Sequence, residues 1–275
     1  MNTGKKKTGA LGRLYMALIF LFLYAPIVVL IVFSFNDTKT MSRSVWSGFT
    51  FRWYARLWED SMIQQAVWNT LLIAVLSALI ATVFGTVAAV GLYRMRGWRK
   101  KVMMNLTNFP MVNPEIVTGV SMMLLFVFMA QVFKIGSLGM WSILIAHVTF
   151  CLPYVILSVL PKLAQMDKNL FEAAQDLGCP PLQAFRKVVV PQIMPGIVTG
   201  MIMAFTLSID DFVITYFCSG TTQTLPIYIY SMTKRRVSPE INALSTVLFV
   251  VILLLLVLTN LHGGKEKKKK EAPAR

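Results

Sequence analysis

Three acidic side chains lie inside long apolar stretches of this sequence, and acidic groups in such surroundings can bind cations. Glu115 follows Asn113 and Pro114, while Asp210 and Asp211 are neighbours in "TLSIDDFVI". An ionisable group is costly at membrane depth, so it usually faces a polar interior and marks a transport path or a paired charge. No Lys or Arg lies within these two stretches to pair with the acids. The sequence therefore favours a visiting cation as the partner of at least one of the three.

A structural role for the same acids is the alternative interpretation. Glu115 would then satisfy the start of a helix, and Asp210 and Asp211 would hydrogen-bond to neighbouring helices. Adjacent helical residues point about 100° apart, so Asp210 and Asp211 cannot both face one narrow path. We expect one of them to line the path and the other to cap a helix or pair elsewhere.

Four further side chains are candidates for this site or for packing around it. Ser208, Trp53 and Tyr24 are candidate path residues. Trp53 lies in the aromatic segment "VWSGFTFRWYARLW", for which anchoring at the membrane interface is the alternative, and packing is the alternative for Tyr24. We interpret His147 as a hydrogen-bonded packing residue, because a proton relay would need titrating partners that the sequence does not identify.

The elements that position these residues are apolar segments of membrane length. The chain is 56% hydrophobic and 14% charged, a composition typical of membrane proteins. Stretches that approach or exceed the roughly 20 residues of a membrane span occur at 14–35, 66–93, 102–133, 140–160, 192–217 and 241–261. We predict an all-α integral membrane protein with six transmembrane helices in one domain, 14–261. The first stretch imitates a signal peptide, but its length and lack of a cleavage site favour an uncleaved anchor.

The location of the basic residues predicts the orientation of the chain. Lys and Arg number 27 against 12 Asp and Glu, and 19 of the 27 fall on one side of the predicted topology. By the positive-inside rule both termini are cytoplasmic, with a basic segment 1–13 and a basic, disordered tail 262–275. The excess of charge indicates attraction to anionic membrane lipid and not to nucleic acid. The three cysteines lie at separate depths, so we expect no disulfide framework and no metal site.

The third stretch, 102–133, is too long for one straight span and contains Pro110 and Pro114. Proline removes a backbone donor and clashes with the preceding turn, so the helix should kink or break here. Broken backbone at membrane depth persists only inside protein or beside a water-filled cavity. Asn113, Pro114 and Glu115 then fit the N-cap, first and second positions of a new helix, which places a carboxylate at a positive helix end.

The segment "EAAQDLGCPPLQAFRKVVVP" is a polar interruption between two apolar stretches. Asp167 or Asn169 can cap a short helix, and Gly178 can end it in the left-handed conformation. The apolar positions of this helix share one face: Leu170, Ala174 and Leu177. Pro181 can start a second helix over 182–190, which Pro191 closes. We expect a helix–turn–helix on the cytoplasmic side.

The spacing of Glu172, Ala173, Ala174, Gly178 and Pro191 resembles the EAA loop of the membrane subunits of ABC importers. In that family the first short helix of the loop fits a groove on the cytoplasmic ATPase and couples its closure to the channel. The resemblance implies the same ATPase-coupling role for these five residues. Two valines stand where isoleucine and leucine are commoner in the family, which is a mild departure.

Eight segments, with the EAA segment among them, extend this resemblance to nearly the whole chain, from about residue 26 to 246. They are "SFND", "GFTFRWY", "NPEIV", "HVTFCLPYV", "EAAQDLG", "FTLSIDDFVI", "LPIYIYSM" and "SPEINALST". Together they resemble the spermidine/putrescine permease (PotC) family of ABC importers. The departures are the extended basic tail and Glu115, where the family often has aspartate. A polyamine carries several ammonium groups, which suit paired carboxylates and aromatic faces.

The resemblance implies a type I ABC importer permease fold in a bacterial inner membrane, with the EAA loop over 167–191. It implies three kinds of partner beside the membrane lipid indicated by the basic charge: a second permease (PotB-like), two ATPases (PotA-like) and an external polyamine-binding protein (PotD-like). The chain would form half of the translocation path. It lacks a GxxxxGK[ST] phosphate loop, so we expect no catalytic activity and no cofactor of its own, with ATP and Mg bound by the partner ATPases.

Other functions remain open on the residues alone. The same machine could carry iron, sulfate or another cation, although unbalanced carboxylates would repel an anion. An ion-coupled secondary transporter would work through titrating acids, and its uptake would survive ATP depletion. If the chain were a non-transporting scaffold, polyamine import would be normal in its absence. An enzyme is disfavoured, because "DDFVI" lacks a second acidic cluster and the sequence offers no nucleophile–base set.

Overall fold

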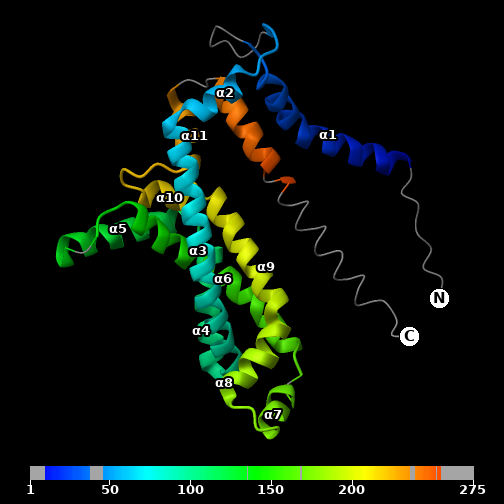
Figure 1. The fold of residues 1–275 in the computed structure, drawn as a ribbon, viewed down its shortest axis with the longest axis vertical. Helices are drawn as coiled ribbons and strands as arrows, with labels where there is room; N and C mark the ends of the chain where they lie inside the picture. The colour runs from blue at the N-terminus through cyan, green and yellow to red at the C-terminus, as the bar shows by residue number, and fades with distance from the viewer. Residues whose placement is uncertain are drawn as a thin grey trace. The chain divides into compact units, whose positions relative to one another are not determined.

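The computed structural model describes residues 10–37, 46–134, 136–167, 169–235, 239–251 and 253–254. These residues are helical apart from their connections and an isolated β-bridge between Asn36 and Phe49. Along the chain (Figure 1) the elements are α1 (Ala10–Phe33), α2 (Arg52–Glu59), α3 (Ser61–Arg94), α4 (Gly97–Val112), α5 (Glu115–Phe133), α6 (Met140–Gln165), α7 (Asn169–Asp176), α8 (Pro181–Ala184), a π-helical turn (Phe185–Val189), α9 (Val190–Asp210), α10 (Val213–Cys218) and α11 (Leu225–Arg235).

Five helical segments in the described part of the chain are long and apolar enough to cross a membrane. They are Gly12–Phe33, Ser61–Arg94, Glu115–Phe133, Met140–Gln165 and Pro181–Asp210. The all-α membrane fold expected from composition is thereby confirmed. Of the sixth predicted span, 241–261, the structure describes an apolar helix over Pro239–Val251, and most of the remainder lies outside the described residues. The predicted tail 262–275 also lies outside them.

The chain forms two compact units. Unit 1 comprises Met1–Gln64 and Ile229–Arg275, and unit 2 comprises Gln65–Tyr228. In unit 1 the chain after α1 folds back on α2, where the hydroxyls of Ser34 and Tyr54 lie 2.6 Å apart. Arg56 of α2 contacts Glu240, with Nη1 and Oε1 3.2 Å apart. These contacts tie two sequence-distant parts of unit 1 together.

The core of unit 2 is built where α3, α6 and α9 approach closely. A Cβ placed on Gly196 of α9 would lie 2.8 Å from the carbonyl oxygen of Ser158 on α6. A Cβ on Gly85 of α3 would lie 2.7 Å from Cγ1 of Val155. Such small residues let helix backbones pack tightly in membranes, where dispersion contacts replace the hydrophobic drive of water. The fully buried side chains around these contacts include Ile73, Ile143, Val159, Leu163, Ile193 and Ile214.

The predicted break in the third apolar stretch is confirmed. α4 ends at Val112, α5 begins at Glu115, and the two helices run in different directions (Figure 1). The register differs by one residue from the prediction, since Pro114 is the N-cap and Glu115 the first helical residue. Asn113 still belongs to the end of α4, because its N–H donates to the carbonyl of Phe109 at 3.1 Å.

The predicted fifth span, 192–217, is wrong as a continuous helix. α9 ends at Asp210, Asp211 has extended backbone with φ −67° and ψ 119°, and α10 begins at Val213. The carboxylate of Asp211 accepts backbone N–H groups of the following turn. This local capping competes with continuation of the helix and explains why the chain breaks here.

Pro191 does not close a helix, which corrects the prediction for the end of the EAA loop. It lies in the first turn of α9, and helical backbone runs on from Pro181 through the π-helical turn to Asp210. The N–H of Val190 donates to the carbonyl of Phe185 across this wider turn. A π turn inserts one residue and changes the path of the backbone, and Pro is tolerated near a helix start because it needs no N–H there.

Candidate functional site

The break between α9 and α10 holds a buried polar network centred on Asp211. Its Oδ2 accepts the N–H of Thr215 at 2.8 Å, and its Oδ1 accepts the N–H of Ile214 at 3.3 Å. The hydroxyl of Thr215 also donates to Oδ2 at 2.8 Å. The residue is only 9% exposed. Asp211 therefore caps α10, the role that the sequence left open between it and Asp210.

His147 of α6 joins this network to α3. Its Nε2 lies 2.8 Å from the hydroxyl of Thr215 and 3.3 Å from Oδ2 of Asp211. Its Nδ1 lies 2.7 Å from the hydroxyl of Ser208, which accepts a hydrogen bond from Ser77 of α3 at 2.9 Å. A neutral imidazole protonated at Nε2 satisfies each of these groups, because Nδ1 then accepts from Ser208. The network links four helices through His147, which is hydrogen-bonded as expected of a packing residue.

A Ser, a His and an Asp in contact invite comparison with a hydrolytic triad, but the geometry excludes that chemistry here. His147 and Ser208 are each 3% exposed. The space among them and Asp211 is too small to hold a water molecule. A nucleophile must reach a substrate atom to react, and none can enter this site. The network instead fixes the shape of the broken helix.

Glu115 and Asp210 differ from Asp211 because both are exposed. Glu115 occupies the first turn of α5 and Asp210 the last turn of α9. Neither takes part in an ion pair among the described residues. One turn after Glu115, a Cβ on Gly119 would lie 2.8 Å from the ring of Phe217 on α10. Since α5 and α10 pack this closely, the two helix breaks belong to one region of unit 2.

The remaining predicted path residues have other surroundings. Ser208 is a member of the buried network described above. Trp53 is buried in unit 1, where its Nε1 donates to the carbonyl of Asn36 at 2.8 Å and the guanidinium of Arg52 lies 4.7 Å from its ring centroid. Tyr24 is exposed on α1, with its ring centroid 6.2 Å from that of Phe20. Packing contacts therefore dominate at Trp53.

The predicted short helix of the EAA loop is present as α7, at the end of unit 2 away from α10 (Figure 1). Asp167 caps its start, because Oδ1 accepts the N–H of Asn169 at 3.0 Å. Gly178 follows its end with φ +82°. The N–H of Gly178 donates to Gln175 at 2.8 Å, and the next N–H donates to Ala174 at 3.1 Å. These two bonds form a Schellman motif, so the predicted role of Gly178 is confirmed.

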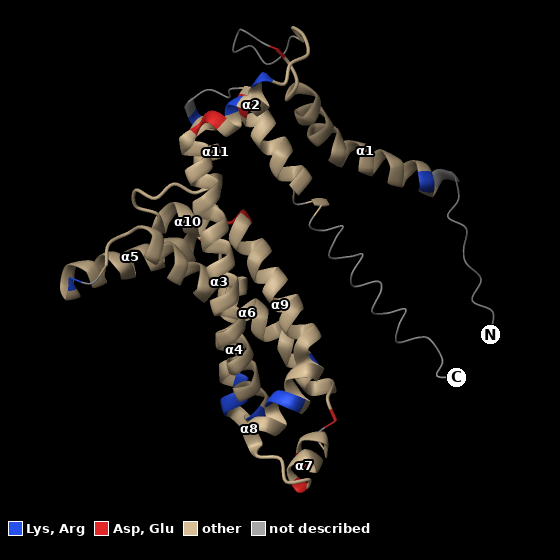
Figure 2. Cartoon of the chain, viewed as in Figure 1, with Lys and Arg blue, Asp and Glu red and all other residues tan. Residues whose placement is uncertain are grey.

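The inward side of α7 differs from the predicted apolar face. Phe171 is half-buried and packs against the hydrophobic core, whereas Leu170 and Leu177 are exposed, the latter at 89%. The sequence spacing grouped the two leucines with Ala174, but the ring of Phe171 makes the packing contact with the core. Glu172 and Ala173 are also exposed, and Ala174 is half-buried. α7 therefore presents acidic and apolar side chains outward; Figure 2 shows acidic positions on α7 and basic segments beside α8.

Sequence reasoning did not identify Ser77 and Thr215 as members of the polar network. Thr215 follows Asp211 by four residues, a spacing at which side chains meet on a helix or at its start, and this was the only local signal. Ser77 lies 131 positions from Ser208 in the sequence, so nothing local could have paired them.

Residues 81–263 match the family described as binding-protein-dependent transport system inner membrane component. The sequence is 40% identical over 246 residues to the spermidine/putrescine transport system permease protein PotC of Escherichia coli (strain K12), covering 88% of this chain and 90% of that protein. It is 42% identical over 234 residues to the putrescine transport system permease protein PotI of the same strain, covering 83% of this chain and 82% of that protein.

Two solved structures have a similar fold at low sequence identity. A chain from a bacterial ABC transporter involved in the import of the acidic polysaccharide alginate matches with a TM-score of 0.70 at 16% identity, covering 94% of this chain and 98% of that one. A chain of the inward-facing MetNI methionine ABC transporter matches with a TM-score of 0.59 at 20% identity, covering 73% and 94%. The fold is that of an ABC transporter permease, as the sequence predicted.

Proposed function

We propose that this chain, which belongs to the family of binding-protein-dependent transport system inner membrane components, is a permease subunit of an ATP-driven polyamine importer. The relatives named for spermidine and putrescine support this cargo class. The chain supplies half of the translocation path and hydrolyses no ATP itself.

One observation carries the cargo class: two exposed carboxylates, Glu115 and Asp210, stand at helix breaks in the same region of unit 2. Neither pairs with a cation among the described residues. In a water-filled path such groups attract a polycation, and each ammonium–carboxylate contact is a charge-assisted hydrogen bond. Asp211 and Ser208 act indirectly, by holding the break that presents Asp210.

The exposed surface of α7 supports coupling to an ATPase. Glu172, Ala173 and Leu177 are exposed, and the Schellman motif at Gly178 fixes where the helix ends. A short, well-capped helix with an acidic and apolar surface can fit a groove on a partner subunit. Pro191 lies in the first turn of α9, so movement of α7 and α8 is transmitted through the π-helical turn to the helix that carries Asp210.

The proposed assembly has this chain beside a second permease, above two cytoplasmic ATPases that bind ATP and Mg, with an external binding protein that delivers polyamine. Both termini and α7 lie on the cytoplasmic side, in agreement with the concentration of Lys and Arg around α4 and the π-helical turn. Closure of the ATPases draws the coupling helices together and turns the path outward. ATP hydrolysis then lets the path reopen inward.

Reconstitution of the complete importer in proteoliposomes tests this function. The chain is combined with its second permease, ATPases and binding protein, and ATP hydrolysis is measured with spermidine, putrescine or no cargo. We expect polyamine to stimulate hydrolysis and to be accumulated inside the vesicles. Cargo-independent hydrolysis without polyamine accumulation would contradict the cargo class. Uptake that persists without ATP and collapses with the ion gradient would instead identify a secondary transporter.

A further inference from the structure

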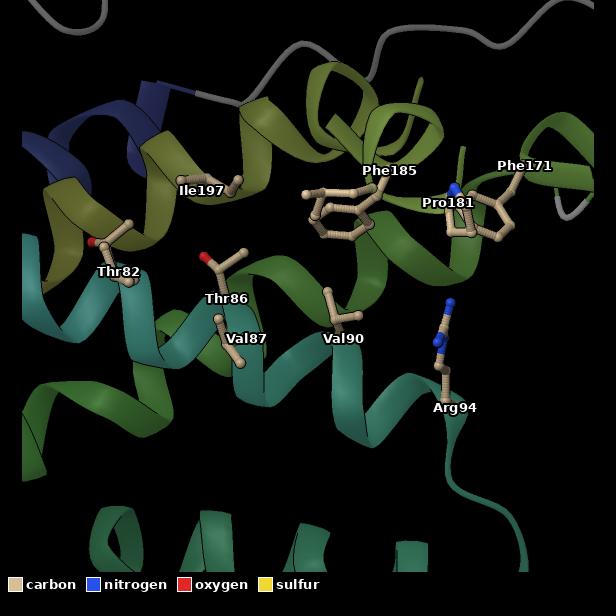
Figure 3. Close-up of a pocket in the computed structure, with 11 residues that line it drawn as sticks. Thr82, Thr86, Val87, Val90, Arg94, Phe171, Pro181, Phe185 and Ile197 are labelled. Atoms are coloured by element: carbon tan, nitrogen blue, oxygen red, sulfur yellow. The ribbon is translucent and has the colours of Figure 1, made fainter. Parts of the chain in front are cut away.

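A groove lies between α3, α9 and the segment that joins α7 to α9 (Figure 3). Its volume is about 690 Å³. Val87 and Val90 of α3 line one side, and Phe185 and Ile197 line the other. Figure 3 shows Thr82, Thr86, Val90 and Arg94 following one another along α3 opposite these side chains. In a membrane, an apolar groove of this kind is filled by a lipid acyl chain or by another protein surface.

A basic pocket of about 460 Å³ continues the groove at one end. Arg96 and Lys100 line only this pocket. The two cavities share four lining residues: Val90, Arg94, Phe171 and Phe185. A ligand that occupied both would therefore need an apolar part and an anionic part joined end to end.

Two observations indicate that the basic pocket takes an oxyanion. Among the described residues, no carboxylate forms an ion pair with Arg94, Arg96 or Lys100. The hydroxyl of Tyr93, which also lines this pocket, is buried and has no hydrogen-bond partner within the described part of the chain. Buried hydroxyls are rarely left unpaired. A phosphate would supply both the negative charge and the missing acceptor.

The length of the groove matches one leaflet of a bilayer. Thr82 and Arg94 are twelve residues apart in α3, a rise of about 18 Å. Half of a hydrocarbon core of roughly 30 Å is about 15 Å. An acyl chain that lies along α3 from Arg94 towards Thr82 would therefore span about one leaflet, with its headgroup at the interface.

We infer that this groove and basic pocket form a binding site for one anionic phospholipid, with an acyl chain between α3 and α9 and the phosphate at Arg94. The inference rests on the proposed orientation, which places Arg94 at the cytoplasmic interface, where anionic lipid meets basic residues. The guanidinium of Arg94 lies 5.9 Å from the ring centroid of Phe171 on α7. The bound phosphate consequently lies beside the coupling helix and braces it against α3.

To test this, the purified importer in detergent is incubated with dioleoyl phosphatidylglycerol or dioleoyl phosphatidylcholine. Native mass spectrometry then measures how much of each phospholipid the importer retains. We expect the wild type to retain more phosphatidylglycerol. Arg94→Gln should weaken that retention about fivefold, close to the contribution of one basic side chain at an anionic membrane surface. Val87→Trp, which fills the groove, should reduce it at least as much. Lys101→Gln is the matched control, because this exposed cation lines neither cavity.

Equal retention of the two lipids by the wild type would overturn the site. Retention of phosphatidylglycerol at the wild-type level by both Arg94→Gln and Val87→Trp would overturn it too. If Val87→Trp lowers recovery of the second permease or of the ATPases instead, the groove is a protein interface and the lipid site is likewise overturned. Retention is read without cargo or ATP. A negative result for lipid retention therefore does not contradict polyamine import, and a negative result for polyamine import leaves the lipid measurement valid.

Discussion

The imidazole Nε2 of His147 lies 3.3 Å from Oδ2 of Asp211, and both side chains are buried. This contact joins α6 to the break between α9 and α10, because the same carboxylate caps α10. The preceding residue, Asp210, is exposed. Two adjacent acids thus have different surroundings, one buried as a structural cap and one exposed, and we propose different tasks for them.

Replacing each of the two acids by alanine separates these tasks. Asp211→Ala should lower the free energy of unfolding by about 3 kcal/mol, because His147 loses a partner and two backbone N–H groups lose their acceptor. Asp210→Ala should change it by less than about 0.5 kcal/mol, as expected of an exposed site. Unfolding of the purified chain in detergent, followed by tryptophan fluorescence, measures both. Equal losses for the two variants would refute the assignment of the buried cap to Asp211.

Close packing of α6 against α9 predicts intolerance to a single methyl group. In Gly196→Ala the new Cβ would meet the backbone carbonyl of Ser158 at 2.8 Å, so overpacking should cost about 1–3 kcal/mol. For Gly91 of α3, no atom of the described residues outside its own helix backbone lies within 4 Å of an added Cβ. Gly91→Ala should therefore stabilise the chain by about 0.5–1 kcal/mol through helix propensity. The thermal midpoints of the two variants should move in opposite directions, and a similar loss in both would contradict the proposed helix contact.

Gly178 follows α7 in the left-handed conformation, so replacing it by alanine should impair coupling by more than the loss of stability alone explains. Gly178 and Gly136 have φ of +82° and +73°, and apart from their chain neighbours no atom of the described residues lies within 4 Å of a Cβ added to either. Alanine at either should cost about 1–2 kcal/mol of strain. Only Gly178→Ala should also reduce polyamine-stimulated ATP hydrolysis in the reconstituted importer, because it displaces the end of the coupling helix. Equal hydrolysis in the two variants would show that the end of α7 is not critical.

Neutralising the exposed acids should weaken cargo use without unfolding the chain. Glu115→Gln and Asp210→Asn should each raise the KM for spermidine by about tenfold or more, since a hydrogen bond to a charged group contributes roughly 1.5–3 kcal/mol. Glu59→Gln, at an exposed acid of α2, is the control and should leave KM unchanged. Uptake kinetics in proteoliposomes give these values. An unchanged KM in both path variants would remove Glu115 and Asp210 from the cargo site.

Local sequence signals predicted the parts of this fold that depend on one or two residues. Pro114 removes a backbone donor, which is enough to break the third apolar stretch, and Gly178 adopts a conformation that other residues resist. The apolar spans follow from composition in the same way. Each of these signals is contained in one continuous segment of the sequence, so no tertiary information was needed.

Packing decided the features that the sequence did not predict. Asp211 was distinguished from Asp210 by a histidine 64 positions away in the chain. Phe171, and not the spaced leucines, became the inward side of α7 because it reaches the core. Pro191 continued a helix that it was expected to end, since the π-helical turn precedes it. Such outcomes depend on partners that are distant in the sequence, which spacing rules do not include.

Charge reversal at Glu172 tests the coupling of α7 to an ATPase. Glu172 is exposed and lies in the first turn of α7, so lysine there should not disturb the core of unit 2. The measurement is ATP-driven spermidine uptake into proteoliposomes that contain the complete importer, with Glu59→Lys as the matched charge reversal. We expect Glu172→Lys to reduce uptake to the level without ATP and Glu59→Lys to keep the wild-type rate. Wild-type uptake by Glu172→Lys would contradict this coupling.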